Sequence, residues 1–132
     1  MLKGLNHITI AVSNLDRSFD FYVSLLGMKP EVKWELGAYL SVNELWICLS
    51  KDSVKPAQDY SHISFTVDKS DFNNYRTKLL SSGVKIWRQN ASEGDSVYIL
   101  DPDGNKLEIH VGSLKTRLQE LKSNPYKGLK WY

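Results

Sequence analysis

The sequence has little cysteine, no long apolar run and almost no net charge, and each lack narrows the kinds of protein it can be. A single cysteine, Cys48, cannot form a disulfide within the chain, which favours a reducing compartment. No stretch approaches the ~20 apolar residues of a membrane-spanning helix, and the N-terminus has no signal-peptide core. The balance of 17 basic against 15 acidic residues, +2 in all, is too weak for a nucleic-acid surface. We therefore expect a soluble cytoplasmic protein.

An internal repeat is the most informative positive feature. The run His7-Ile-Thr-Ile-Ala-Val12 is matched by His62-Ile-Ser-Phe-Thr-Val67. With 132 residues, 42% of them apolar, the chain suits one domain over 1–132. Its expected parts are repeat one at about 1–52, a linker at about 53–60, repeat two at about 61–112, and a C-terminal helix and tail at 113–132.

The same order of elements is predicted in both halves. Each repeated run is followed by an amphipathic helix, with Asn14 or Asp16 and then Ser70 as candidate N-caps, closed by Gly27 and Gly83 respectively. Short strands follow at about 30–34, 37–42 and 45–50, then 84–88, 95–100 and 106–111, with a strong turn at 101–104 and a short helix at 113–122. This predicts an α+β fold of two βαβββ repeats.

The alternation of side chains along the strands separates an apolar face from a polar one. Apolar residues that should pack on the helices are Ile8, Ile10, Val12, Ile63, Phe65, Val67, Leu107, Ile109 and Val111. The opposite faces carry His7 and Thr9 in the first repeat, and His62 and Glu108 in the second. Two such sheets facing each other would enclose a polar cup.

Two histidines and a glutamate are therefore candidate metal ligands. Imidazole and carboxylate suit Mn²⁺, Fe²⁺, Ni²⁺ or Zn²⁺, and three protein ligands leave positions open for catalysis. A histidine considered alone is more often a hydrogen-bonded core or surface residue. The repeat-related placement of His7 and His62, with Glu108 on the same face, favours a metal site. His110 shares the face of Glu108, and we expect it behind the ligands or at the rim.

Aligning the last strands of the repeats places Trp46 opposite Glu108, which predicts one metal per pair of repeats and an aromatic pocket wall at Trp46. Cys48 as a nucleophile is the weaker alternative, because a lone cysteine usually packs as a small apolar residue. The loop 88–96 has, by composition alone, the character of a solvated turn. Arg88, Tyr98 and Arg117 are candidate donors to an anionic substrate.

The repeats, with a histidine opening each and a glutamate on the last strand, resemble the vicinal oxygen chelate (glyoxalase/bleomycin resistance/dioxygenase) superfamily. Nearly end to end, the chain resembles its fosfomycin-resistance glutathione transferases of the FosA type. The matching runs include Gly4-Leu-Asn-His-Ile-Thr9, Leu45-Trp-Ile-Cys-Leu-Ser50, Asn90-Ala-Ser-Glu-Gly-Asp-Ser96, Leu100-Asp-Pro-Asp-Gly104 and Leu107-Glu-Ile-His-Val-Gly112.

The resemblance implies a homodimer whose halves pair across subunits into cup-shaped sheets, with a Mn²⁺ site shared between the two chains through His7, His62 and Glu108. It implies K⁺ held by Asn90, Ser92, Gly94 and Ser96. The substrate residues it implies are Thr9, Trp46, Arg88, Ser92, Ser96, Tyr98 and Arg117, with the phosphonate of fosfomycin held by all of them except Trp46. Tyr39 and Thr9 would be catalytic, Tyr39 by hydrogen-bonding the glutathione thiol.

Three departures concern the substrate-binding residues: Arg88 replaces the family's lysine, Ala91 an arginine, and Leu36 a polar residue. Two alternatives keep the fold. The first retains the metal site and uses water or another thiol, with Glu44 as a conceivable base. The second is a metal-independent drug-binding protein, which an intact set of metal ligands argues against.

Overall fold

The structure is a computed structural model that describes residues 1–132, and its elements fall into two compact units. The first comprises Met1–Ser61 together with Leu100–Lys106, and the second His62–Ile99 together with Leu107–Tyr132. Each unit holds a four-stranded mixed sheet, so the predicted pair of βαβββ repeats is confirmed. No helix is long and apolar enough to cross a membrane.

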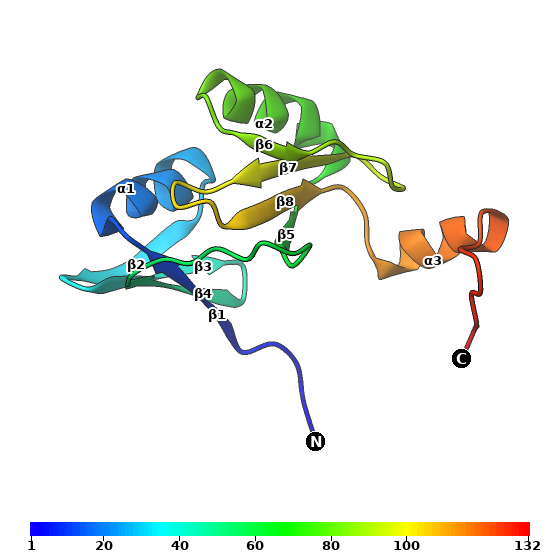
Figure 1. Cartoon of the computed structure of the whole chain (residues 1–132), viewed down its shortest axis with the longest axis horizontal. Helices are drawn as coiled ribbons and strands as arrows, with labels where there is room; N and C mark the ends of the chain where they lie inside the picture. Colours follow the sequence, from blue (N-terminus) through cyan, green and yellow to red (C-terminus); the bar gives the residue numbers. More distant parts are fainter. The chain divides into compact units, whose positions relative to one another are not determined.

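The first sheet has the order β1-β4-β3-β2 (Figure 1). Its strands are β1 (His7–Val12), β2 (Lys29–Trp34), β3 (Gly37–Val42) and β4 (Leu45–Lys51). β1 runs parallel to β4, and β4 and β2 run antiparallel to β3. Ile10 and Val12 are buried while His7 and Thr9 are exposed, which confirms the predicted faces of the first strand.

The helix of the first unit is not uniform. α1 (Leu15–Asp20) begins after Asn14, whose side chain accepts a hydrogen bond from the Arg17 amide at 3.0 Å, so the predicted Asn14 cap is confirmed. The chain then continues as the π-helix η1 (Phe21–Leu25) where a single α-helix was expected. Leu15, Tyr22 and Leu26 are buried, and Figure 1 shows α1 against its sheet.

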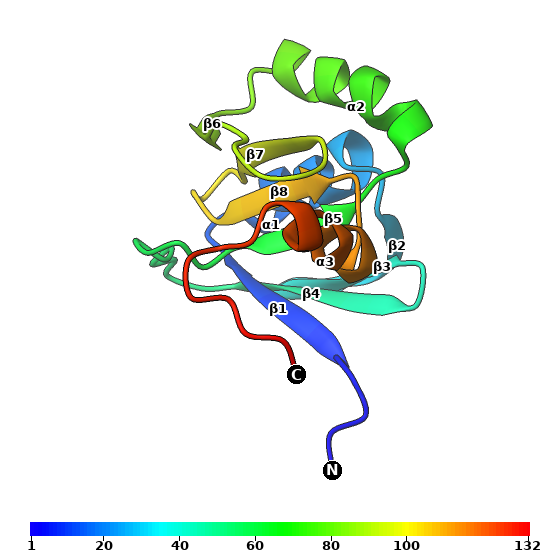
Figure 2. The same ribbon diagram turned by 90° about the vertical axis from the view of Figure 1, so that its right-hand side faces the viewer.

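The second sheet has the order β5-β8-β7-β6. Its elements are β5 (Ile63–Thr66), α2 (Lys69–Ser81), β6 (Ile86–Arg88), β7 (Ser96–Leu100), β8 (Lys106–His110) and α3 (Leu114–Ser123). The predicted Ser70 cap is wrong, because α2 begins at Lys69, two residues before the start that a Ser70 cap would give, and Asp68 occupies the cap position. Ser113 caps α3 in a reciprocal arrangement with Thr116. Figures 1 and 2 show α2 along the sheet and α3 following β8.

The turn between β7 and β8 is held by a buried carboxylate. Asp101 is 5% exposed and accepts a hydrogen bond from the Tyr22 hydroxyl at 2.7 Å. It also accepts from the amides of Asp103 and Asn105, at 2.9 and 2.8 Å, and from the Asn105 side chain at 2.8 Å. Asn105 also donates to the carbonyl of Ala11 in β1 at 3.1 Å. The turn was predicted, but its packing against the first helix was not.

Candidate metal and substrate site

The centre of the second unit's polar face is Glu108, on β8. Its side chain is 10% exposed, and its Oε2 lies 3.0 Å from Nε2 of His62. The neighbouring strand places Ser64 beside it in register. Because Leu107 and Ile109 point into the apolar core, alternation along β8 directs Glu108 to the opposite face. Two of the three predicted metal ligands therefore meet.

Ser96 and His110 complete a polar cluster around Glu108. The Ser96 hydroxyl is 2.5 Å from Oε1 of Glu108 and 2.7 Å from Nδ1 of His110. His110 Nδ1 is itself 3.5 Å from Oε1 of Glu108. Burial alone would raise the pKa of Glu108, but hydrogen bonds from Ser96 and His62 and the nearby imidazoles outweigh it, so that pKa lies below its ordinary value. Glu108 is an anionic acceptor at neutral pH.

The separation of His62 and Glu108 fits the chemistry of a divalent metal. Two ligands of one ion, each about 2.1 Å from the metal and at right angles, lie about 3 Å apart. The 3.0 Å between Nε2 of His62 and Oε2 of Glu108 matches that spacing. No group of three or more His, Cys, Asp or Glu side chains that could hold a metal is present in the structure. The third predicted ligand, His7, belongs to the first unit, and the structure gives its surroundings there.

In the first unit, an aromatic row begins at His7. The rings of His7 and Trp46 have centroids 4.4 Å apart, Trp46 and Tyr39 are 5.0 Å apart, and Tyr39 and Trp34 are 4.8 Å apart. Tyr39 and Trp46 are each 37% exposed, so the row has an open side. Nδ1 of His7 lies 2.7 Å from the side-chain oxygen of Asn6, which leaves its Nε2 on the opposite edge of the ring. Thr9 is exposed on the same strand.

The oxygen-rich loop between β6 and β7 is folded on itself. The Asn90 amide donates to the Gly94 carbonyl at 2.8 Å, and the Ser92 amide donates to the Asn90 side-chain oxygen at 3.2 Å. Gly94 has φ of 81°, a conformation that glycine adopts without strain. Three of the four predicted potassium residues thus share one small loop, while the Ser96 hydroxyl turns toward Glu108.

Arg117, on α3, is held against this loop. Its guanidinium donates to the Glu93 carboxylate at 3.2 Å and to the Glu93 carbonyl at 3.1 Å, with Ser92 Oγ at 3.5 Å. The structure therefore brings Arg117 and Ser92 together, as the anion-binding prediction needs. It also supplies Glu93 as a competitor for the same guanidinium, which the sequence did not indicate.

Trp87 packs beside two of the candidate site residues, His62 and Tyr98, which the sequence did not indicate. Its ring lies edge-on to His62 at 5.5 Å and to Tyr98 at 5.3 Å, and its indole N–H donates to the Leu107 carbonyl at 3.0 Å. Tyr98 is 3% exposed, whereas Arg88, its neighbour in register, is exposed. The only sign in the sequence was a tryptophan next to Arg88 in a predicted strand, and the structure shows that this tryptophan is half-buried.

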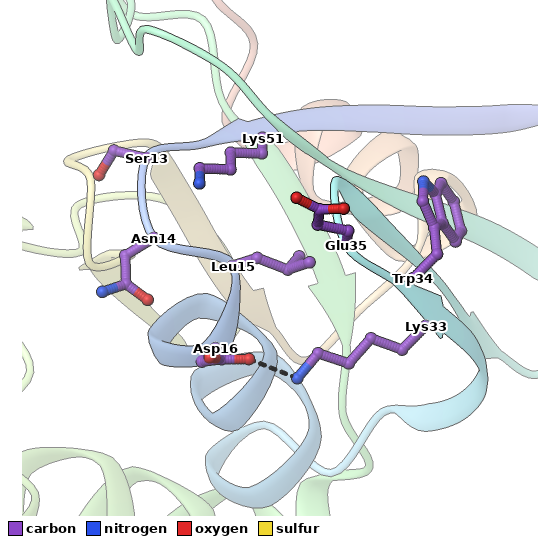
Figure 3. A pocket seen from close by; sticks show the side chains of 8 residues that line it. All are labelled: Ser13, Asn14, Leu15, Asp16, Lys33, Trp34, Glu35 and Lys51. Atoms are coloured by element: carbon purple, nitrogen blue, oxygen red, sulfur yellow. Dashed lines mark hydrogen bonds and ion pairs between the residues drawn. The ribbon is translucent and has the colours of Figure 1, made fainter.

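A pocket of about 650 Å³ lies elsewhere in the first unit (Figure 3). It is lined by Ser13, Asn14, Leu15, Asp16, Lys33, Trp34, Glu35 and Lys51. Lys33 donates to Asp16 at 2.6 Å, and this hydrogen bond and positive charge hold the pKa of Asp16 below its ordinary value. None of the predicted site residues lines this pocket.

Comparison with known proteins identifies the family. A model of the Glyoxalase/Bleomycin resistance protein/Dioxygenase superfamily matches residues 4–109. The chain belongs to this superfamily. It is 49% identical over 134 residues to glutathione transferase FosA of Serratia marcescens, covering 98% of this chain and 95% of that relative. It is 36% identical to metallothiol transferase FosB of Staphylococcus epidermidis, over 92% of this chain and 93% of the relative.

Solved structures of the superfamily agree with the fold. The fosfomycin resistance protein FosX of Listeria monocytogenes, in complex with Mn(II) and sulfate, has a TM-score of 0.81 at 27% identity and covers 91% of this chain and 98% of its own. A glutamate-to-glutamine mutant of that protein, with Mn(II) and dihydroxypropylphosphonic acid, has a TM-score of 0.80 at 26% identity, covering 90% of this chain and 99% of its own. The resemblance inferred from the sequence is confirmed.

Proposed function

We propose that this protein is a fosfomycin-resistance enzyme that adds the thiol of glutathione to the epoxide of fosfomycin. The observation that carries the proposal is the 49% identity, over nearly the whole chain, to a glutathione transferase FosA. The relatives named as metallothiol transferases FosB are 32–37% identical, and the FosX structures 26–27%. Because the sequence identity to the glutathione transferase is higher than the identity to the other relatives, glutathione is the favoured thiol.

The proposed metal is Mn²⁺, held by the ligands His7, His62 and Glu108, a set that also suits other divalent metals. Support comes from the 3.0 Å approach of His62 to an anionic Glu108 and from Mn(II) in the FosX complexes. The ion would act as a Lewis acid on the epoxide oxygen, where negative charge develops as carbon is attacked. In the structure His62 contacts Glu108 directly, so metal binding replaces that hydrogen bond.

The phosphonate of fosfomycin would be bound by a set of donors from both repeats: Thr9, Arg88, Ser92, Ser96, Tyr98 and Arg117. The contact of Arg117 with Ser92 at 3.5 Å supports a shared place for two of them. A guanidinium suits an oxyanion because its N–H groups pair with two oxygens at once. A phosphonate would share the Arg117 guanidinium with Glu93 and would take the single hydroxyl hydrogen of Ser96 away from Glu108.

K⁺ is proposed for the loop that carries Asn90, Ser92, Gly94 and Ser96. Oxygen atoms gathered in one tight loop suit a hard cation, and a positive charge there would offset the phosphonate. The Gly94 carbonyl accepts from Asn90, and because a carbonyl oxygen has two lone pairs it could also bind a cation.

The thiol would approach along the aromatic row of the first unit. Glutathione's thiol, with an ordinary pKa of about 8.5, is only a few per cent thiolate at neutral pH. A hydrogen bond from Tyr39 would stabilise the thiolate, and Trp46 would form an apolar wall for the epoxide carbon. The contact of Tyr39 with Trp46, and of Trp46 with His7, supports placing thiol and metal next to each other.

We further propose that the protein works as a homodimer in which His7 of one chain completes the site of the other. Each repeat supplies only part of the ligand set, which is the reason to pair them. Sedimentation of the purified protein would test this, with a dimer expected and a monomer that still binds Mn²⁺ contradicting it.

Water is the competing nucleophile, because one FosX structure holds dihydroxypropylphosphonic acid, the diol that hydration of the epoxide would give. Glu44, the candidate base, lies in the tight turn between β3 and β4 and is exposed. A carboxylate exposed in a turn is more often simply solvated than catalytic. The weakness of Glu44 as a base therefore favours the thiol reaction over hydration.

Product analysis separates these reactions. The purified protein is incubated with Mn²⁺, K⁺ and fosfomycin, with glutathione, cysteine or no thiol, and the products are identified by mass spectrometry. We expect the glutathione adduct to form fastest. A diol without thiol would favour hydration, and a cysteine adduct formed faster than the glutathione adduct would overturn the choice of thiol. Tight binding of unreacted fosfomycin with no product would indicate a drug-binding protein.

A further inference from the structure

His110 occupies a defined place behind Glu108. It lies two residues further along β8, on the same face, and its side chain is 17% exposed. Nδ1 of its ring is 2.7 Å from the hydroxyl of Ser96, and that hydroxyl is 2.5 Å from Oε1 of Glu108. Ser96 thus stands between a carboxylate and an imidazole.

The hydrogen count of these three groups fixes which atom donates. An ionised carboxylate only accepts hydrogen bonds, so the single hydroxyl hydrogen of Ser96 points to Glu108. The Ser96 oxygen must then accept from His110, which requires a hydrogen on Nδ1. The chain of hydrogen bonds runs in one direction, from His110 to Ser96 to Glu108.

Two glycines make room for the His110 ring. A Cβ atom on Gly94 would lie 2.8 Å from Cε1 of His110, and a Cβ atom on Gly112 would lie 2.7 Å from its Nε2. Gly94 belongs to the oxygen-rich loop, and Gly112 precedes the cap of α3. Next to the ring, the Val111 amide donates to the Asp95 carbonyl at 2.9 Å. The ring therefore packs between the loop and the start of α3.

We propose that His110 is a positioning residue, which holds the Ser96 hydroxyl against Glu108 and thereby fixes the carboxylate for a divalent cation. This rests on the proposed metal site but not on which substrate or thiol is used. Groups that orient a metal ligand commonly change metal affinity 10- to 100-fold when they are removed. His110 needs to touch neither metal nor substrate to have this effect.

The test compares two variants of similar size. In His110→Asn the side-chain amide can donate from nearly the position of Nδ1, whereas His110→Leu fills the space and cannot donate. Mn²⁺ affinity is measured by electron paramagnetic resonance of the metal without fosfomycin or glutathione. We expect binding about 10- to 100-fold weaker in His110→Leu and within about threefold of the unmodified protein in His110→Asn. Ser96→Ala should resemble the leucine variant, and Ser64→Ala, on the same face, should bind normally.

Equal affinities in all variants would overturn the proposal, as would an equal loss in His110→Asn and His110→Leu, which would indicate packing alone. The ¹⁵N shifts of the His110 ring give a reading that does not involve metal: the Nδ1–H form is expected, with a changed shift in Ser96→Ala. The opposite tautomer would also overturn it. Because no substrate is present, a protein that binds Mn²⁺ but fails to modify fosfomycin would refute the proposed reaction and still test His110.

Discussion

Nε2 of His62 lies 3.0 Å from Oε2 of Glu108, at the spacing of two ligands of one metal ion. If Glu108 is a ligand, Glu108→Gln should keep the shape of the side chain but lose the anionic donor. We expect Mn²⁺ affinity to fall at least about 100-fold, since a lost ligand costs more than a lost orienting group. Glu35→Gln, in an exposed turn, is the control. Unchanged Mn²⁺ affinity in Glu108→Gln would refute this ligand.

The proposed role of Tyr39 separates chemistry from metal binding. Tyr39→Phe keeps the ring contacts with Trp34 and Trp46 but removes the hydroxyl. We expect the rate of thiol addition to fall about 100-fold while Mn²⁺ affinity stays the same. Steady-state kinetics with glutathione measures the first quantity and metal titration the second, and Tyr132→Phe serves as control. A normal rate in Tyr39→Phe would remove Tyr39 from the mechanism.

The buried hydrogen bond between Tyr22 and Asp101 should contribute to the stability of the fold and not to catalysis. Asp101 accepts four hydrogen bonds, so Asp101→Asn should lower the free energy of unfolding by about 3 kcal/mol, and Tyr22→Phe by about 1.5–3 kcal/mol. Urea denaturation measures both. Asp20→Asn, an exposed position, should change it by less than about 0.5 kcal/mol. Equal stability of all three variants would show that the buried contact contributes nothing.

The same pair predicts how stability changes in alkali. Burial, and then the negative charge of Asp101, raise the pKa of Tyr22 far above its ordinary value of 10.0. The folded protein therefore keeps the proton while the unfolded chain loses it, so this contribution is complete below pH 10 and is lost as pH rises further. Between about pH 8 and about pH 11, the unmodified protein should lose more stability than Tyr22→Phe. Burial also raises the pKa of Tyr75 to about 12, but Tyr75 is common to both proteins.

Parallel losses of stability in the two proteins over that range would contradict the assignment to Tyr22. The tyrosinate absorbance of the folded proteins offers a direct check. In the unfolded chain every tyrosine should titrate near its ordinary pKa. In the folded protein each buried tyrosine should be missing from that group.

Local patterns in the sequence predicted most of the strands and their faces. Alternation along β1 and β8 correctly separated Ile10 and Leu107 from His7 and Glu108, because side-chain direction in a strand depends only on position. The Asn14 cap was predicted for the same local reason. The predicted Ser70 cap was wrong because Asp68 lies two residues earlier. Aspartate and serine are both favoured at the N-cap, so residue type alone could not decide between them.

Contacts between distant residues could not be predicted in this way. Nothing near Asp101 indicates that its carboxylate is buried against Tyr22, and the π-helical turn at Phe21–Leu25 has no sequence signature here. The position of the Ser96 hydroxyl between Glu108 and His110 depends on how β7 and β8 are aligned, and the sequence did not predict that alignment. The repeat led to the candidate metal ligands, and the family resemblance to the other candidate residues, whereas the hydrogen bonds among them were not predicted.

Metal-dependent addition of glutathione to fosfomycin can be tested in a single titration. Protein stripped with a chelator is given increasing Mn²⁺ with fosfomycin and glutathione, and both the bound metal and the adduct are measured in each sample. We expect no adduct above the uncatalysed level without metal, and a rate that rises in proportion to the Mn²⁺ bound. Full activity in the stripped protein, or bound Mn²⁺ with no adduct, would contradict it.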